Sequence, residues 1–387
     1  MTHLFINYLA ASAGGGLTYV RNVTPLFSAT PGFRFTVALS PDLRREFGHL
    51  PNVDFVELGL PPARRFWYEQ RTLPELIRKS GANVLLSAGN FALRKSPVPQ
   101  ILLSRNSLYV SGDFSRDLLE RREFRMWLDL RARAFLAKRS IEWADVTVAP
   151  SHAFASELQR WTGENVIVIH HGFDRDAFVR DTTPLAPEVQ LKLDAVEGAF
   201  KILFVSHYNY YRNFETLIRA LPIVRDRLSG TPVRLLLTCE LAAGKNPGQY
   251  RPDRAANLVR ELGVSDMVVE LGSVPYKKLH QLYGRADVYA TPAYTETFAH
   301  PLVEAMASGV PVVASDIPVH REICGAAALY FERFSPEALA NCIVRVAEDK
   351  VMRATMVDGG TSRAGDFSWR VHVNQILELA RNLTSND

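Results

Sequence analysis

The stretch TETFAHPLVEAMASGVPVV, residues 295–313, has the residue order of a loop, a short helix and a buried strand. Pro301 suits the first turn of a helix, and Gly309 is a typical residue at the point where a helix stops. The apolar run that starts at Val310 predicts a strand that is buried on both faces. Because helices that connect such strands build parallel sheets, this stretch predicts an α/β fold.

The same alternation of short apolar strands and amphipathic helices continues along the 387 residues of the chain. Several of the candidate strands are continuous β-branched runs, as expected for strands buried between helices. The candidate strands are 4–8, 34–39, 54–57, 84–87, 100–103, 145–149, 166–170, 201–205, 234–238, 268–271, 288–291 and 311–314.

A chain of this length usually forms two domains. The stretch 181–199 contains two prolines and is followed at once by a new candidate strand, so we expect the domain boundary there. The sequence therefore predicts one domain at 1–185, a second at 186–366, and a last helical segment at 367–387.

The composition is that of a globular protein, with 47% hydrophobic and 22% charged residues. Its three cysteines, Cys239, Cys324 and Cys342, are an odd number, which is typical of reduced thiols in the cytoplasm. The first residues, MTHLFINYL, resemble a buried strand and lack the features of a signal peptide. No apolar run approaches the ~18 residues that span a bilayer. We therefore expect a cytoplasmic protein that is not integral to a membrane.

Two carboxylates bracket the start of the helix in the opening stretch. Glu296 lies on the loop, and Glu304 lies one turn inside the helix. Such a pair can hold two hydroxyl-bearing parts of one ligand, while the helix amides between them hold its phosphates. The alternative is that one glutamate caps the helix and the other is solvated.

A second candidate site is the loop that follows the strand at 201–205. Asn213 suits the N-cap of the next helix, and Arg212 directly before it provides a cation close to free helix amides. His207 lies on the same loop, at the carboxyl end of the strand, where α/β sheets bind ligands. The loop therefore suits a diphosphate, although an arginine beside a cap is often only a surface residue.

A third candidate is Gly14-Gly15-Gly16, between the first strand and a helix. Glycines at such a turn let a ligand approach the backbone and leave helix amides free for an anion. The spacing is not GxGxxG, so it does not predict a dinucleotide site. A tight turn without a ligand is an equal alternative.

Two further patterns bear on metals and membranes. Asp174-Arg-Asp176 has the form of a DxD metal motif, and no other Asp, His or Cys cluster in the sequence suggests a metal. Residues 116–139 contain eight Lys and Arg against four Asp and Glu, with Phe124 and Trp127 among them. Such a stretch can bind an anionic lipid surface or a lipid-phosphate acceptor. The alternative is a solvated helix face.

Taken together, these segments resemble the GT-B glycosyltransferases of the retaining family 4, also called glycosyl transferases group 1. Glu296 and Glu304 match the family's E-x7-E motif, and VSHYNYYRNFETL at 205–217 resembles its G-R-x4-K-G/N segment. The other segments that carry the resemblance are 14–16, 149–152, 171–178, 272–292 and 367–369.

The resemblance implies two Rossmann-like domains that face each other across a cleft. The first domain is expected to bind the acceptor and the second the nucleotide sugar, with the C-terminal helix returning to the first domain. It implies retaining transfer of a hexosyl group to a glycan, a lipid-linked or a small-molecule acceptor, for instance in polysaccharide biosynthesis. It implies no cofactor, no metal and no nucleic acid, and a location in the cytoplasm or at the inner face of the membrane.

The resemblance also assigns roles to individual residues. Glu304 is expected to bind the ribose of the donor, and Glu296 the transferred sugar. Arg212 is expected to hold the diphosphate, with the catalytic residues being Glu296, Arg212 and His207. The remaining donor-binding positions are Thr297, Phe298, Ala299, Gly15, Gly16 and Ser206.

The chain departs from the family pattern at two positions and leaves one unassigned. Ser206 stands where the family usually has Gly, and His207 stands where it has a diphosphate-binding Arg. A neutral imidazole binds an anion more weakly than a guanidinium does. Leu103 is followed by Ser-Arg-Asn, which offers no clear equivalent of the acceptor-side His of the family. Two alternatives therefore stand beside a transferase: a nucleotide-sugar isomerase or epimerase of this fold, and a non-catalytic nucleotide-sugar-binding partner subunit.

Overall fold

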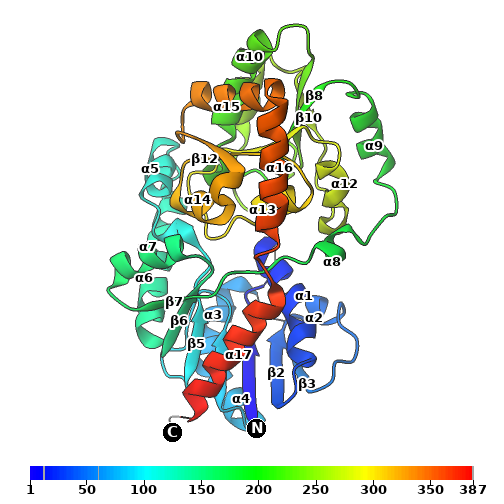
Figure 1. Ribbon diagram of the computed structural model, residues 1–387. Helices are drawn as coiled ribbons and strands as arrows, with labels where there is room; N and C mark the ends of the chain where they lie inside the picture. Colours follow the sequence, from blue (N-terminus) through cyan, green and yellow to red (C-terminus); the bar gives the residue numbers. More distant parts are fainter. Residues whose placement is uncertain (12–13, 60, 386–387) are drawn as a thin grey trace. The chain divides into compact units, whose positions relative to one another are not determined.

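A computed structural model describes residues 1–11, 14–59 and 61–385 (Figure 1). The chain forms two compact units, the first from residues 1–172 and 368–387, and the second from residues 173–367. Each unit contains one parallel sheet covered by helices, which confirms the predicted α/β class.

The sheet of unit 1 has seven strands in the order β3-β2-β1-β4-β5-β6-β7, and all neighbours are parallel. From β1 the chain adds strands outward to β3, and it then returns to place β4 on the other side of β1. The gap between β1 and β4 is therefore the switch point, where open α/β sheets bind ligands. The strands are β1 (Thr2–Asn7), β2 (Phe33–Leu39), β3 (Val53–Glu57), β4 (Val84–Ser87), β5 (Gln100–Leu103), β6 (Val146–Ala149) and β7 (Val166–Val168).

The sheet of unit 2 has six parallel strands in the order β10-β9-β8-β11-β12-β13, with its switch point between β8 and β11. All the strands expected from the sequence are present, within about two residues at each end. The strand β13 was not predicted, because it is a short edge strand without an alternating pattern. The strands are β8 (Phe200–Phe204), β9 (Val233–Leu237), β10 (Val268–Glu270), β11 (Val288–Thr291), β12 (Val312–Ser315) and β13 (Ala328–Phe331).

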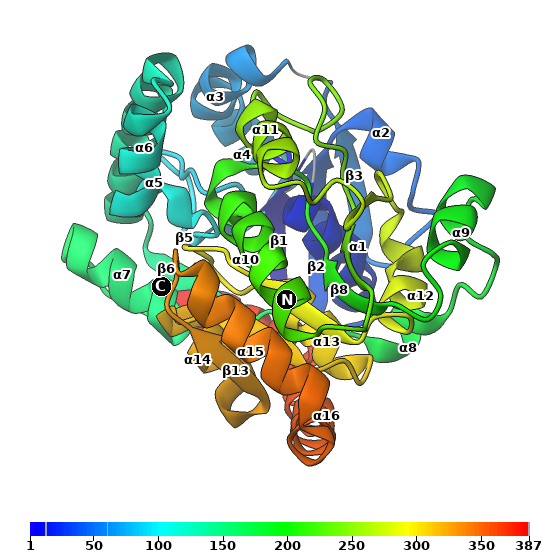
Figure 2. The ribbon, with the colours of Figure 1, turned by 90° about the horizontal axis from the view of Figure 1, so that it is seen from above.

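Helices connect the strands and cover the sheets, as Figures 1 and 2 show. Unit 1 contains α1 (Gly14–Ser28), α2 (Pro41–Arg44), α3 (Pro62–Arg71), α4 (Leu73–Ser80), α5 (Gly112–Glu120), α6 (Phe124–Trp143), α7 (His152–Thr162) and α17 (Trp369–Ser385). Unit 2 contains α8 (Arg175–Val179), α9 (Pro187–Asp194), α10 (Phe214–Arg227), α11 (Asp253–Glu261), α12 (Leu279–Tyr283), α13 (His300–Ala307), α14 (Pro318–Cys324), α15 (Pro336–Glu348) and α16 (Lys350–Ala364). Short 3-10 turns lie at Ser107–Tyr109, Tyr210–Arg212, Tyr276–Lys278 and Gly325–Ala327.

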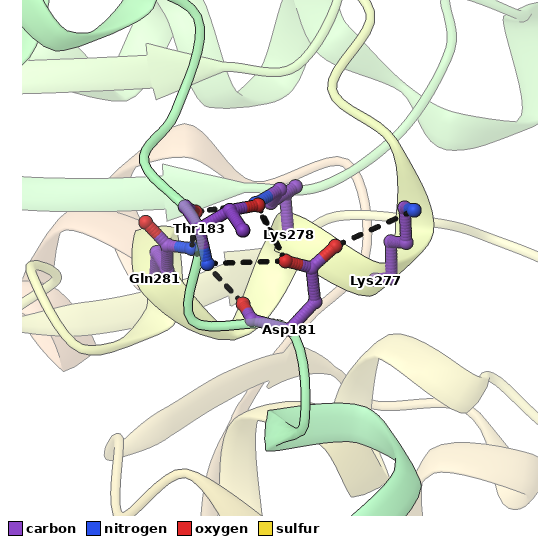
Figure 3. A network of polar contacts seen from close by, with 5 residues as sticks. All are labelled: Asp181, Thr183, Lys277, Lys278 and Gln281. Carbon is purple, nitrogen blue, oxygen red and sulfur yellow. Dashed lines mark hydrogen bonds and ion pairs between the residues drawn. The ribbon is translucent and has the colours of Figure 1, made fainter.

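The boundary between the units lies between Gly172 and Phe173, earlier in the chain than residue 185. The segment after it belongs to unit 2 because its polar groups are bound there (Figure 3). The ammonium group of Lys278 lies 2.8 Å from a carboxylate oxygen of Asp181 and also contacts Thr183. The side-chain amide of Gln281 donates to the carbonyl oxygen of Thr183 at 2.9 Å. The connecting segment is therefore fastened to unit 2.

The C-terminal helix α17 belongs to unit 1, where it packs against α1 and β1. Its residues Ile376, Leu377 and Ala380 lie within the same hydrophobic core as β1 and α1. Burying a large apolar side chain in this way stabilises the folded state by roughly 1.5–3 kcal/mol. The helix is thus a structural part of the first unit.

Gly172 lies against the start of α17. A Cβ at this position would be 1.9 Å from the backbone nitrogen of Trp369, so an added methyl group must displace backbone. We expect Gly172→Ala to lower the free energy of unfolding by about 3 kcal/mol or more, as severe overpacking does. Urea denaturation would measure the change. Gly112→Ala is the matched control, because nothing lies within 4 Å of a Cβ there, and equal stability of the two variants would contradict the prediction.

Candidate functional site

The site in unit 2 is built from the loops that follow β8 and β11. These two strands are neighbours on either side of the switch point, and their carboxyl ends lie at the same edge of the sheet. The loop after β8 carries Ser206, His207 and Arg212, and the loop after β11 carries Glu296. The topology therefore brings together two segments that are far apart in the sequence.

Polar contacts join the two loops. Arg212 and Glu296 form an ion pair. The backbone N–H of Tyr294 donates to the carbonyl of Tyr211 at 3.1 Å, and the side-chain amide of Asn213 donates to the carbonyl of Pro292 at 3.2 Å. Hydrogen bonds and an ion pair within the protein thus hold the two loops together.

Asn213 occupies the N-cap position of α10, as predicted, but it does not cap the helix with its side chain. Its backbone is left-handed, with φ of 55°, a conformation that asparagine adopts more readily than most residues. Besides its bond to the other loop, its side-chain oxygen accepts from the hydroxyl of Thr216 at 2.9 Å. The residue therefore turns the chain and joins the loops.

The ion pair between Arg212 and Glu296 is largely shielded from solvent. Desolvation raises the pKa of Glu296, and the positive charge of Arg212 opposes that rise. The guanidinium Nε of Arg212 is buried and has no hydrogen-bond partner within the described part of the chain. Because removing one partner of such a pair leaves an uncompensated buried charge, the two residues act as a unit.

Glu304 lies on the second turn of α13 and is 3% exposed. Burial raises the pKa of its carboxyl group to about 7, and the hydrogen bond from Tyr283 partly offsets this effect. The hydroxyl of Tyr283 donates to one carboxylate oxygen at 3.0 Å. No sequence signal marks Tyr283 as a partner of Glu304, because it lies on α12, outside the E-x7-E motif.

The helix α13 begins at His300, after Ala299 in a left-handed conformation with φ of 62°. A non-glycine residue in this conformation is uncommon and marks a constrained turn. Thr297, Phe298 and Ala299 form that turn, so their backbone lies directly before the helix start. The start of a helix is the positive end of its dipole, which suits an anion.

His207 and Ser206 stand at the start of the loop after β8. His207 is exposed, yet desolvation of its ring and the nearby charge of Arg212 both lower its pKa. The backbone N–H of Ser206 donates to the hydroxyl of Thr238 at 2.9 Å. The Ser206 hydroxyl donates to the carbonyl of His207 at 2.7 Å, so it braces its own loop.

We expect His207→Arg to keep or improve donor binding. A protonated His207 would attract a diphosphate, and the bound anion would raise the lowered pKa of the ring. Relative to the Arg variant, the wild type should therefore lose affinity as the pH rises through the pKa of the ring in the complex. The comparison isolates His207, because both proteins keep the carboxyl group of Glu304, whose pKa of about 7 affects binding at low pH in both. Calorimetric titration with UDP at several pH values tests this, and His49→Arg, at an exposed position of unit 1, is the control. Equal pH profiles of wild type and variant would contradict it.

In unit 1 the predicted glycine turn starts α1 at the carboxyl end of β1. Gly14 has a φ of +52°, and nothing lies within 4 Å of a Cβ added at Gly14 or Gly15. A Cβ at Gly16 would be 3.6 Å from the Cα of Ala11. The first two glycines thus leave open space at a helix start, and the third allows close packing.

The DxD-like triplet has a structural explanation. The side chain of Asp174 accepts a hydrogen bond from the backbone N–H of Ala177 at 2.9 Å and caps α8. An N-cap aspartate is one of the most favourable capping residues.

Residues 116–139 form most of α5 and α6. Phe124, Leu128 and Phe135 are 57%, 61% and 65% exposed, and Arg125 and Arg131 are exposed on the same helix. Leu130 is buried and the indole of Trp127 donates to the hydroxyl of Ser115 at 3.0 Å, so these two belong to the packed side. Within the described residues, no helix is both apolar enough and long enough to cross a bilayer.

Two family models match the chain. The model of the glycosyl transferases group 1 matches residues 187–363, and the model of glycosyltransferase family 4 matches residues 13–177. Together they cover most of the chain, including the glycine turn of unit 1 and the loops after β8 and β11 in unit 2.

Curated relatives are D-inositol 3-phosphate glycosyltransferases. The protein from Corynebacterium aurimucosum is 27% identical over 257 residues, which are 65% of this chain and 60% of that protein. The protein from Mycolicibacterium vanbaalenii is 32% identical over 219 residues, which are 54% of this chain and 46% of that protein. The matches therefore span less than two thirds of the length of these relatives.

Solved structures resemble the fold over the whole chain. Sucrose-phosphate synthase from Thermosynechococcus elongatus superposes with a TM-score of 0.78 at 20% identity and full coverage of both chains. HepE from Anabaena, in complex with UDP-glucose, superposes with a TM-score of 0.73 at 18% identity, covering 99% of this chain and 100% of that chain. At such identities the likeness shows the fold alone, and it confirms the fold expected from the sequence.

Proposed function

Because the chain belongs to the glycosyl transferases of group 1, we propose that it transfers a hexosyl group from a nucleotide-diphosphate sugar to a hydroxyl group of an acceptor. The transfer retains the configuration at the anomeric carbon. The acceptor is a glycan, a glycolipid or a small molecule, and the reaction takes place in the cytoplasm without a metal ion.

The observation that carries this proposal is the joining of Arg212, Glu296 and the start of α13 at the switch point of unit 2. Arg212 and the backbone N–H groups before α13 would hold the diphosphate. Glu304 would accept hydrogen bonds from the ribose, and Glu296 would hold the sugar. His207 would add positive charge when it is protonated.

The proposed chemistry breaks the bond between the anomeric carbon and the diphosphate oxygen and forms a bond from the same carbon to the acceptor oxygen. The acceptor hydroxyl loses its proton to the departing diphosphate. Arg212 and the helix N–H groups stabilise the negative charge that builds up on the leaving group, which is usually the largest catalytic contribution in such sites. The ion pair of Arg212 with Glu296 and the hydrogen bonds between the two loops support this role, because groups held in place need little reorganisation.

UDP-glucose is the first donor to test, because a structural neighbour was solved with it. Thermal-shift measurements with a panel of nucleoside diphosphates would identify the base, and product NMR after incubation with donor and an acceptor panel would give the anomeric configuration.

Turnover of the donor alone to an epimer would favour an isomerase. Nucleotide binding without any turnover would favour a non-catalytic partner subunit, and an inverted product would contradict retention.

We also propose that α6 contacts an anionic lipid surface. Phe124, Leu128 and Phe135 would enter the interface, while the arginines beside them bind lipid phosphates. We expect sedimentation with liposomes that contain phosphatidylglycerol, and weaker binding at high salt. Replacing Phe124 and Leu128 by Ser should abolish sedimentation, whereas Leu191→Ser, at a 69% exposed position of unit 2, should not. Absence of binding at low ionic strength would leave α6 a solvated helix.

A further inference from the structure

Arg105 lies at the carboxyl end of the sheet in unit 1, two residues after β5. Its backbone N–H donates to the side-chain oxygen of Asn90 at 2.6 Å, and Asn90 has a left-handed backbone with φ of 66°. One terminal nitrogen of its guanidinium group donates to the carbonyl of Ala88, which follows β4, at 2.6 Å. Both the backbone and the guanidinium group of Arg105 are therefore held in place by hydrogen bonds.

The guanidinium group reaches the switch point of unit 1. Its central carbon lies 4.5 Å from the centre of the Tyr19 ring, and Tyr19 belongs to α1, the helix that follows β1. Arg105 thus extends from the end of β5 past the end of β4 to the helix after β1. The open turn at Gly14 and Gly15 starts the same helix.

The positive charge of Arg105 has no carboxylate partner in the described residues. Its Nε is buried and makes no hydrogen bond within them, although the residue as a whole is partly exposed. Burial lowers the pKa of the guanidinium, and the side chains that oppose this are the tyrosines Tyr19 and Tyr8. A desolvated cation without a counter-charge is costly, and an oxyanion that bonds to the free N–H groups would remove that cost.

We propose that Arg105 binds an oxyanion group of the acceptor, a phosphate or a carboxylate, at the switch point of unit 1. This inference rests on the proposed function, in which unit 1 binds the acceptor and the diphosphate of the donor is bound by Arg212 in unit 2. The planar fork of N–H donors in arginine fits both kinds of oxyanion. The start of α1 favours negative charge at the same edge of the sheet.

The test uses the full-length protein with labelled arginine and inorganic phosphate or acetate as the probe. The buried Nε–H groups of Arg105 and Arg212 would be observed by NMR and assigned by their loss in Arg105→Lys and Arg212→Lys. Phosphate at millimolar concentrations should shift the Arg105 signal in a saturable way, also after UDP has been added to occupy the donor site. A response to phosphate but not to acetate assigns the site to a phosphate group, and a response to both includes a carboxylate.

Arg105→Gln should weaken the binding of phosphate at this site at least about tenfold, as the loss of a charge-assisted hydrogen bond does. Arg45→Gln, at an exposed position of the same unit, should not change it. If the Arg105 signal does not respond to either anion, or responds only until UDP is bound, the proposal is overturned. Failure of UDP to bind would contradict the proposed function. A saturable response of the Arg105 signal to phosphate would even then support an anion site in unit 1.

Discussion

Glu296→Gln is expected to lower kcat by roughly 10²-fold, with a much smaller change in the donor KM. The proposed role of Glu296 is to hold the sugar whose ring becomes positively charged, so its contribution should be greatest in the transition state. Steady-state kinetics with saturating acceptor would measure both constants. A change in KM alone would show that Glu296 is only a binding residue.

The ion pair with Arg212 requires a control, because the same substitution removes the counter-charge of a buried guanidinium. Breaking such a pair costs about 3–5 kcal/mol of stability. Arg212→Gln and the double variant complete a double-mutant cycle, in which both urea denaturation and kcat are measured. The double variant should regain stability, whereas its kcat should stay low because both side chains are proposed to contact the donor. Recovery of kcat in the double variant would contradict the proposed roles of both residues.

Glu304→Ala is expected to raise the donor KM by about 10–150-fold, which corresponds to the ~1.5–3 kcal/mol of a hydrogen bond to a charged group. The ribose does not change during the reaction, so the loss should be uniform binding energy and kcat should change less. Because burial raises the pKa of this carboxyl to about 7, donor binding in the wild type should also weaken as the pH falls below that value.

Tyr283→Phe is the matched control for Glu304. It removes the hydrogen bond at 3.0 Å but leaves the carboxylate in place. The pKa of Glu304 should rise further, because that hydrogen bond lowers it. The pH below which donor binding weakens should then move upward, while binding at alkaline pH stays close to wild type. A KM as high as that of Glu304→Ala at every pH would show that Tyr283 itself binds the donor.

The sequence predicted the elements of the fold well, because strands buried on both faces are continuous apolar runs that can be recognised without knowing their partners. Strand β11 is an example, with all four residues buried. It also predicted which loops carry the polar residues of the candidate site, because Pro and Gly mark the start and end of α13.

Pairwise contacts could not be predicted in the same way. The ion pair of Arg212 with Glu296 joins residues 84 positions apart, and it depends on the strand order, which the sequence pattern does not state. Asn213 has a residue type that suits a cap, and only the structure shows that its side chain binds the other loop. The segment near Asp181 contains prolines like a linker, but its contacts with Lys278 attach it to unit 2.

The order in which the ribosome makes this chain does not match the order in which its units are completed. The chain leaves unit 1 at Gly172 and returns at Ser368, and the ends of the intervening part are neighbours, since the N–H of Phe173 donates to the carbonyl of Phe367 at 3.2 Å. Unit 2 can therefore fold as a closed insertion, while the first sheet waits for α17. At about 5–20 residues per second, the delay for the roughly 200 intervening residues is on the order of 10–40 s. During that time the nascent first sheet exposes the apolar surface that α17 later covers, and exposed apolar surface of this kind is what chaperones protect from aggregation.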